Sequence, residues 1–218
     1  MFSVNEIFYS IEGEGIRAGY PCVFVRFNGC NLHCKYCDTG YAQRPGIPNM
    51  NVSDIVSQVK EYNCPRVTLT GGEPLLQKGI DKLVDVLVHE DIEVNIETNG
   101  SIPLDLYYWP AEGVLFTVDY KTGASGESSK MYMENFQYLC HSDVIKFVVG
   151  SKEDIRQAFD VVDKYLNQWN PPMIFFSPVF GEIEPKDIVE AIKQSGHTEC
   201  RVQLQLHKFI WPPEQRGV

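Results

Sequence analysis

The sequence predicts an α/β fold in which a parallel sheet forms an incomplete, open (β/α)6-type barrel. Strand-like and helix-like segments alternate, with short connections, over residues 26–207. This order favours a parallel sheet with right-handed crossovers. About six βα units can be counted, too few for a complete eight-stranded barrel. Polar residues and glycines gather at the carboxyl ends of the strands, where α/β sheets carry their sites.

The size and composition are those of an ordinary soluble protein. The 218 residues suffice for one α/β core, and no repeat or low-complexity tract divides them, so we expect a single domain over residues 1–218. The net charge of -10 argues against a broad nucleic-acid surface. Seven cysteines, an odd number, favour a reducing, cytoplasmic environment. We expect neither a signal peptide nor a membrane span.

The expected strands are rich in β-branched and aromatic residues and end at turn residues. An acidic, glycine-rich turn at residues 12–15 follows the first strand; glycine there lets the backbone approach a ligand, although a plain hairpin turn has the same composition. The strands are expected at residues 6–11, 22–27, 66–70, 93–100, 114–121, 143–149, 173–177 and 201–207.

Apolar residues at helical spacing predict helices between these strands. Asn51 or Ser53 can cap the first helix, which is expected to run to about Tyr62. The loop at residues 122–129 is flexible by composition and is a candidate lid. The other helices are expected at residues 75–89, 131–140, 151–168 and 185–194.

The most informative stretch is residues 30–39, where Cys30, Cys34 and Cys37 have the spacing Cys-x3-Cys-x2-Cys. Three thiolates can hold three irons of a [4Fe–4S] cluster, because each iron needs one ligand beyond its bridging sulfides. The missing fourth ligand leaves one iron open to a small molecule. A non-catalytic zinc or iron–sulfur module is the alternative, and the absence of a nearby fourth cysteine argues against it. We interpret the remaining cysteines as buried structural thiols: Cys22, Cys64, Cys140 and Cys200.

Other polar residues lie where a ligand could meet them. Arg26 interrupts an apolar strand. A lone arginine in a strand is usually a surface residue, but its apolar neighbours add weight to a buried arginine that faces an anionic ligand. Residues 71–74, Gly-Gly-Glu-Pro, follow a strand and can grip an ammonium group, although a plain βα turn has similar residues. Asp38 and Thr39 can coordinate a hard cation, although an ordinary turn is the simpler explanation.

The cysteine triad and residues 71–74 resemble motifs of the radical S-adenosylmethionine superfamily. Over nearly its whole length the chain resembles, more closely, the family of 7-carboxy-7-deazaguanine synthases of the queuosine pathway. The features that carry this resemblance are residues 10–15, 24–30, 37–39 and 203–208. It implies radical abstraction of hydrogen from C6 of 6-carboxy-5,6,7,8-tetrahydropterin, ring contraction and loss of ammonia.

The resemblance also implies cofactor contacts. Cys30, Cys34 and Cys37 would ligate the cluster, and Gly72 and Glu73 would meet the amino group of S-adenosylmethionine. Thr39 matches a position that binds Mg²⁺, whose remaining ligands would come from substrate and water. Candidates for the ribose and adenine side are Glu97, Asp119, Lys121 and Lys146, although related chains often carry other short sequences at residues 119–121.

For the pterin substrate, the resemblance implies that Arg26 pairs with the carboxylate. It further implies a carbon–nitrogen lyase, a homodimer, a flavodoxin- or ferredoxin-type reductant and a carboxyl terminus near the substrate. The competing interpretation is another radical enzyme, such as an activase that makes a glycyl radical on a partner protein, which would not need Arg26 and Thr39. The implied substrate-binding residues are Ile11, Glu12, Gly13, Arg26 and Thr70.

Overall fold

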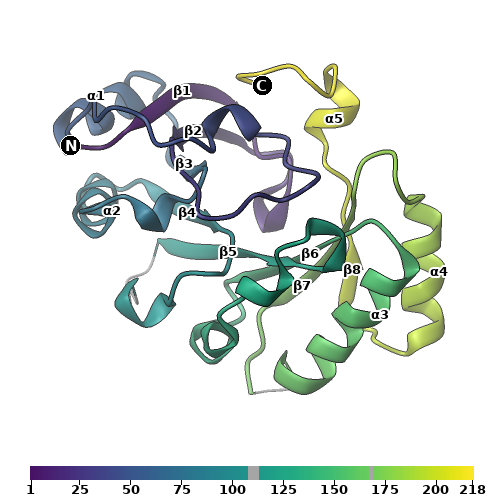
Figure 1. The fold of residues 1–218 in the computed structure, drawn as a ribbon. Coiled ribbons are helices and arrows are strands. Elements are labelled where there is room, and N and C mark those ends of the chain that lie inside the picture. The colour runs from purple at the N-terminus through teal and green to yellow at the C-terminus, as the bar shows by residue number, and fades with distance from the viewer. Residues whose placement is uncertain (108–112, 167–168) are drawn as a thin grey trace.

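The computed structural model describes residues 1–107, 113–166 and 169–218 and has the open α/β barrel that the sequence predicts (Figure 1). Its strands are β1 (Val4–Ile11), β2 (Pro21–Phe27), β3 (Arg66–Gly71), β4 (Glu93–Thr98), β5 (Val114–Lys121), β6 (Val144–Val149), β7 (Met173–Pro178) and β8 (Cys200–Val202). They form one sheet in chain order, with β2 to β8 parallel and β1 antiparallel to β2. Among the described residues no pairing joins β8 to β1, so the sheet is not closed.

Helices cover the outside of the sheet (Figure 1). They are α1 (Val52–Glu61), α2 (Ile80–His89), α3 (Lys152–Val161) and α4 (Pro185–Ser195). The short α5 (His207–Ile210) lies instead at the cavity, where His207 and Lys208 line the wall. Asn51 is the cap of α1: its side chain accepts a hydrogen bond from the Asp54 N–H, and the Asp54 carboxylate accepts one from the Asn51 N–H. No helix in the described part of the chain has the length and apolar character that a bilayer crossing requires.

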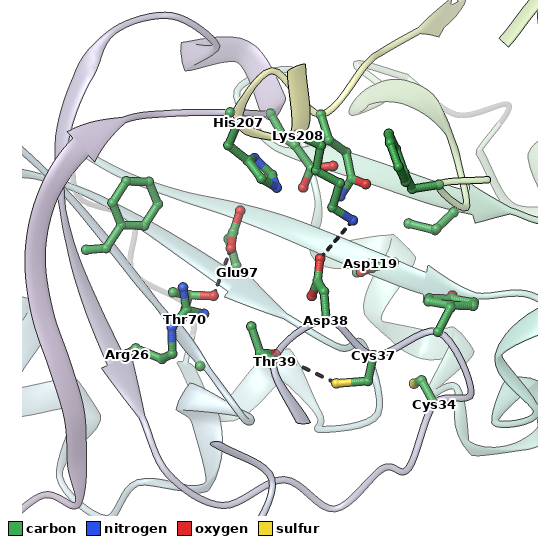
Figure 2. A pocket seen from close by; sticks show the side chains of 18 of the residues that line it. Arg26, Cys34, Cys37, Asp38, Thr39, Thr70, Glu97, Asp119, His207 and Lys208 are labelled. Carbon is green, nitrogen blue, oxygen red and sulfur yellow. Dashed lines mark hydrogen bonds and ion pairs between the residues drawn. The ribbon is translucent and has the colours of Figure 1, made fainter. Parts of the chain in front are cut away.

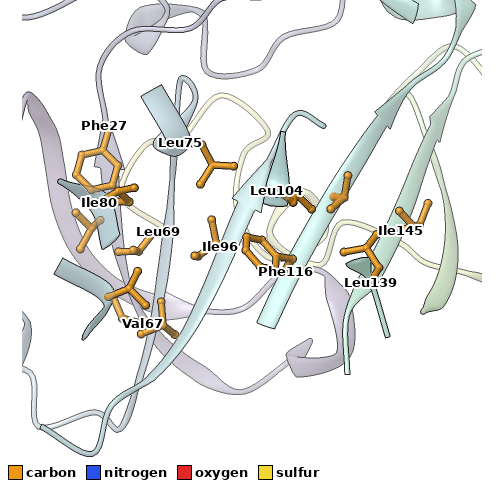
Figure 3. Packing of buried hydrophobic residues seen from close by; sticks show 14 of the residues in the cluster. Phe27, Val67, Leu69, Leu75, Ile80, Ile96, Leu104, Phe116, Leu139 and Ile145 are labelled. Carbon is orange, nitrogen blue, oxygen red and sulfur yellow. The ribbon is translucent and has the colours of Figure 1, made fainter. Parts of the chain in front are cut away.

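The two faces of the sheet have different chemistry because side chains alternate along each strand. On β3, Val67 and Leu69 face outward and join the hydrophobic core beneath the helices (Figure 3). Alternating with them, Thr68 and Thr70 face the barrel interior and hydrogen-bond to the carboxylates of Glu12 and Glu97. Burial of the outer face supplies hydrophobic stabilisation of about 25 cal/mol per Å². The inner face can therefore carry the polar residues of a site.

The helix predicted at residues 75–89 begins later than expected. A 3₁₀ turn at Pro74–Leu76 comes first, and α2 starts only at Ile80. Gly79 separates the two with a φ of +84°, a left-handed conformation that a continuous helix cannot contain. Local apolar spacing did not reveal this break, because the 3₁₀ turn buries Leu75 beside the same core.

Two other predicted helices also differ from the structure. The segment expected to be helical at residues 131–140 forms a 3₁₀ helix at Met133–Tyr138. In the helix predicted at residues 151–168, α3 ends at Val161 and a π-helical segment continues over Val162–Leu166. The predicted end of that helix, Gln168, lies outside the described residues.

The prediction of a strand at residues 201–207 is wrong in its second half, because β8 ends at Val202. After β8, the Gln203 side chain accepts a hydrogen bond from the Gly15 N–H at 2.8 Å and donates one to the Gly15 carbonyl at 3.0 Å. The Leu206 N–H donates to the carbonyl of Gly13 at 3.1 Å. The chain leaves the sheet here because these groups bond to the turn that follows β1.

Residues 122–129 do not form the flexible lid that their composition suggested. Thr122 and Ser125 are completely buried, and the Thr122 hydroxyl donates to the carbonyl of Val148 at 2.9 Å. The Lys35 N–H donates to the carbonyl of Ser125 at 3.0 Å. The segment is therefore a packed support for the cysteine loop.

We expect Gly71→Ala to destabilise the fold much more than Gly79→Ala. Both glycines have a positive φ, +128° and +84°, which costs another residue about 1–2 kcal/mol. At Gly71 a Cβ would also lie 2.3 Å from backbone atoms of Phe27, whereas at Gly79 it would meet nothing within 4 Å. Urea denaturation should show a loss of roughly 3 kcal/mol or more for Gly71→Ala. Equal losses of unfolding free energy for the two variants would show that the close approach of β2 and β3 adds nothing to the cost of a side chain at Gly71.

Candidate active site

A cavity of about 670 Å³ lies inside the barrel at the carboxyl edge of the parallel strands. Its walls come from the strand ends, the cysteine loop, the turn after β1 and the last segment of the chain (Figure 2). A volume of this size suits small-molecule ligands. The predicted site residues that line it are Ile11, Glu12, Gly13, Arg26, Cys30, Cys34, Cys37, Thr39, Thr70, Gly72, Glu97, Asp119, Lys121 and Lys146.

The thiols of Cys30, Cys34 and Cys37 lie half-buried on one side of the cavity and form no disulfide. The Cys30 N–H donates to the carbonyl of Gln43 at 2.9 Å, which closes the loop at its base. Burial raises the pKa of the Cys34 thiol to about 11. Three free thiols on one cavity match the donor set that an iron–sulfur cluster needs, and metal binding deprotonates such thiols.

Gly72 lets the cysteine loop approach the sheet closely. A Cβ at Gly72 would lie 2.1 Å from the carbonyl oxygen of Gly29, next to the first cysteine. The cysteine loop therefore lies directly beside the backbone of the glycine turn. Separately, among the described residues no group of three or more histidine, cysteine, aspartate or glutamate side chains is arranged to hold a single metal ion.

Asp38 and Thr39 have different surroundings. The Asp38 carboxylate lies 3.0 Å from the Lys208 ammonium, so an ion pair already engages it. The Thr39 hydroxyl lies 3.7 Å from the Cys37 sulfur and lines the cavity (Figure 2). Of the two predicted cation ligands, Asp38 is therefore already engaged by an ammonium group, whereas the Thr39 hydroxyl faces the cavity beside Cys37.

A buried ion network crosses the cavity wall. The Lys146 ammonium lies 2.6 Å from Glu14 and 3.7 Å from Asp119, and Lys121 lies 2.7 Å from the same Asp119 oxygen. Burial opposes the charge on Lys146, but Glu14, Asp119 and Glu97 outweigh it and raise the pKa of Lys146 well above its usual value. One oxygen each of Glu14 and Asp119 has no hydrogen-bond partner among the described residues, and both residues line the cavity.

Glu12 and Glu97 bring two more carboxyl groups to the cavity. The Thr68 hydroxyl donates to Glu12 at 2.5 Å, and the Thr70 hydroxyl donates to Glu97 at 2.8 Å. Burial, reinforced by the charge of Glu97, raises the pKa of Glu12 to about 8. Burial likewise raises the pKa of Glu97, although Lys146 opposes this. Near neutral pH a protonated Glu12 carboxyl can both donate and accept hydrogen bonds.

Arg26 presents its guanidinium to the cavity. Its Nε donates to Glu6 at 2.7 Å, and the Tyr41 hydroxyl donates to the same Glu6 oxygen at 2.9 Å. The Arg26 side chain is only 14% exposed. Because Glu6 engages Nε, the two terminal nitrogens remain available for an anion.

Glu73 is the one predicted site residue that does not line the cavity. It is completely buried, and its carboxylate accepts hydrogen bonds from the Asn99 N–H at 2.7 Å, the Thr98 hydroxyl at 2.9 Å and the Leu75 N–H at 3.0 Å. Burial raises the pKa of Glu73 to about 7, although these bonds oppose the shift. Glu73 therefore stabilises the turn after β4 from the protein interior. In the turn at residues 71–74, Gly72 lines the cavity and Glu73 does not.

Several cavity residues were not predicted from the sequence. Residues 201–207 were predicted as a strand, although the polar character of residues 203–207 matches that of the other strand ends. Tyr41 and Arg216 gave no local signal, because their role depends on packing between distant segments. Val218 lies on the cavity wall. The missed residues include Glu14, Tyr41, His207, Lys208 and Arg216.

The cysteines outside the triad do not line the cavity. Cys22, Cys64 and Cys200 are buried, as predicted. The prediction for Cys140 is wrong: it is only half-buried, with its sulfur 3.1 Å from the Ser142 hydroxyl.

We expect Glu12→Gln to weaken the pH dependence of stability. The folded protein keeps the Glu12 proton up to a pKa of about 8, against 4.5 for the solvated carboxyl of the unfolded chain, so wild-type stability falls as pH rises between these values. The variant lacks this ionisation, so its unfolding free energy relative to that of the wild type should rise by about 4 kcal/mol from pH 4.5 to 8. Urea denaturation across that range measures the gain. Parallel pH profiles would contradict it.

Comparison with known proteins identifies the family. The model of the radical SAM superfamily matches residues 24–195. A protein of Clostridium acetobutylicum named 7-carboxy-7-deazaguanine synthase is 43% identical over 220 residues, covering 100% of this chain and 99% of its own. A protein of the same name from Chlorobaculum tepidum is 37% identical over 219 residues, covering 99% and 97%.

Solved structures agree on the fold. QueE from Escherichia coli matches with a TM-score of 0.74 at 21% identity, covering 94% of both chains. Streptococcus suis SuiB bound to S-adenosylmethionine matches with a TM-score of 0.56 at 15% identity, covering 80% of this chain and 44% of SuiB. The superfamily implies a [4Fe–4S] cluster and S-adenosylmethionine, which fits the three cavity-facing thiols. The chain belongs to the radical SAM superfamily and, within it, to the 7-carboxy-7-deazaguanine synthase family.

Proposed function

We propose that this enzyme converts 6-carboxy-5,6,7,8-tetrahydropterin into 7-carboxy-7-deazaguanine with release of ammonia, as a carbon–nitrogen lyase of queuosine and 7-deazapurine synthesis. The observation that carries this proposal is the joint presence on one cavity of three free thiols, a partly engaged arginine and buried carboxyl groups. The name of the full-length relatives supports it. A glycyl-radical activase would act on a protein surface and would not need this combination.

In this proposal Cys30, Cys34 and Cys37 hold the cluster, and the Gly72 backbone receives the amino group of S-adenosylmethionine. The two cofactors, when bound, supply the radical chemistry. The chain positions them and keeps water away from the reacting atoms. The proposed ribose and adenine contacts are Glu97, Asp119, Lys121 and Lys146.

The pterin is proposed to lie between the turn after β1 and the ends of β2 and β3. The terminal nitrogens of Arg26 bind its carboxylate, because Nε is already held by Glu6. Glu12 and Thr70, with the backbone at Ile11 and Gly13, hydrogen-bond to its ring. The buried pair of Lys146 and Glu14 keeps that turn in place.

Mg²⁺ is proposed to bind at Thr39. Its hydroxyl lines the cavity beside Cys37, while Lys208 holds the neighbouring Asp38 carboxylate. One protein oxygen with substrate and water oxygens suits Mg²⁺, which usually keeps several waters.

The domain organisation, assembly, location and partners of the enzyme are part of the proposed function. The chain is one domain, as the single continuous sheet supports, and it acts as a homodimer in the cytoplasm. A flavodoxin- or ferredoxin-type protein supplies the electron. The substrate is a small molecule rather than a nucleic acid or a membrane, in keeping with the acidic net charge of -10.

The test is an anaerobic reaction of reconstituted protein with the carboxytetrahydropterin, S-adenosylmethionine, Mg²⁺ and a reductant. We expect 7-carboxy-7-deazaguanine as product, and we expect Cys34→Ala to lose both product and bound iron. Arg26→Ala should lower kcat/KM about 10- to 100-fold, the effect of one lost charge-assisted bond. Arg66→Ala, outside the cavity, is the matched control and should react normally. Absence of product from iron-replete wild type would falsify the proposal.

For Thr39 we expect a change in metal dependence. Thr39→Ala should raise the Mg²⁺ concentration for half-maximal product formation, because one oxygen ligand is lost. Thr39→Ser keeps the hydroxyl and should restore the wild-type curve. Iron content measured in parallel should be equal in all three proteins. An unchanged Mg²⁺ curve for Thr39→Ala would rule out this ligand.

A further inference from the structure

The last residues of the chain return to the cavity from the far edge of the sheet. After α5, the yellow terminal segment in Figure 1 runs from the β8 side back toward β1. Residues 213–218 line the cavity. Within this segment the Arg216 guanidinium lies 3.7 Å from the centre of the Tyr41 ring, a close stacking distance.

Tyr41 also contacts the other arginine of the cavity. The Arg26 guanidinium lies 5.9 Å from the same ring centre. The Tyr41 hydroxyl and the Arg26 Nε both donate to one oxygen of Glu6. Tyr41 thus joins Arg216, from the end of the chain, to the proposed carboxylate-binding residue on β2.

Arg216 differs from the other cavity-lining lysines and arginines in its pairing. Every other one has a carboxylate within 4.0 Å, whereas Arg216 has none among the described residues. A guanidinium stacked on a ring keeps its N–H donors free at its edge, so it can bind an anion. The pairs of the others are Arg26 with Glu6, Lys121 with Asp119, Lys146 with Glu14 and Lys208 with Asp38.

We propose that Arg216 is a substrate-binding residue that shares the carboxylate of the reduced pterin with Arg26. The inference rests on the proposed function and extends its carboxylate site by a second arginine. A carboxylate has two oxygens with about four lone-pair sites, enough for donors from both guanidinium groups. Stacking on Tyr41 orders the Arg216 side chain before binding, which lowers the entropy lost on binding. Lysine lacks this planar stack, so the site selects arginine.

The experiment measures equilibrium binding by anaerobic calorimetry, with reconstituted protein and no reductant, so that no turnover occurs. The ligands are 6-carboxy-5,6,7,8-tetrahydropterin, the same tetrahydropterin without its carboxylate, and S-adenosylmethionine. Arg216→Ala should weaken binding of the carboxylated pterin about tenfold or more and change the other two affinities less than about twofold. Arg216→Lys should restore only part of the loss. Arg156→Ala, on the exposed face of α3, is the matched control and should bind all three normally.

Three results for Arg216→Ala would overturn this inference alone. Arg216→Ala could bind the carboxylated pterin as wild type does, which would leave Arg216 without a role in binding. It could lose affinity for both pterins equally, which would indicate a structural role of the terminal segment. It could lose affinity for S-adenosylmethionine instead, which would assign the guanidinium to the cofactor. Failure of wild type to bind the carboxylated pterin would overturn the proposed function and this inference with it.

Discussion

The candidate site depends on the buried ammonium of Lys146. It lies on β6 and pairs with Glu14 in the turn after β1 and with Asp119 on β5, so it ties opposite walls of the barrel together. Loss of one partner from a buried ion pair typically costs about 3–5 kcal/mol, because the other charge stays uncompensated. By pairing with these carboxylates, Lys146 compensates their negative charge inside the barrel. The hydrophobic outer face, packed under the helices, supplies the stability that such an interior does not.

The cysteine loop has no regular secondary structure at the thiols, yet the protein holds it at several points. Its base bonds to the segment just after it, and the Lys35 and His33 N–H groups donate to Ser125 and Glu127. Gly72 allows the loop to pack directly on the strand edge. The thiols can therefore keep their positions before metal binds, which lowers the ordering cost of assembly.

An open barrel leaves a gap that a closed barrel would not have, and the two ends of the chain fill it. The turn after β1 enters the interior with Glu12 and Glu14, which are both buried. The segment after β8 bonds to that turn through Gln203 and Leu206 and then continues to the cavity wall. The proposed substrate pocket is thus built from the first and last parts of the sequence.

Local patterns were sufficient for the alternating strands and helices, for a helix cap at Asn51 or Ser53 and for the cysteine triad, because each depends on residues close in sequence. The order of the elements also predicted that the polar strand ends share one edge of the sheet, since parallel strands end on the same side. The burial of Glu73, the packed loop at residues 122–129 and the contact of Arg216 with Tyr41 were not predictable in this way. Each of these arises from packing between segments far apart in the chain, and that packing exists only after the whole sheet has formed.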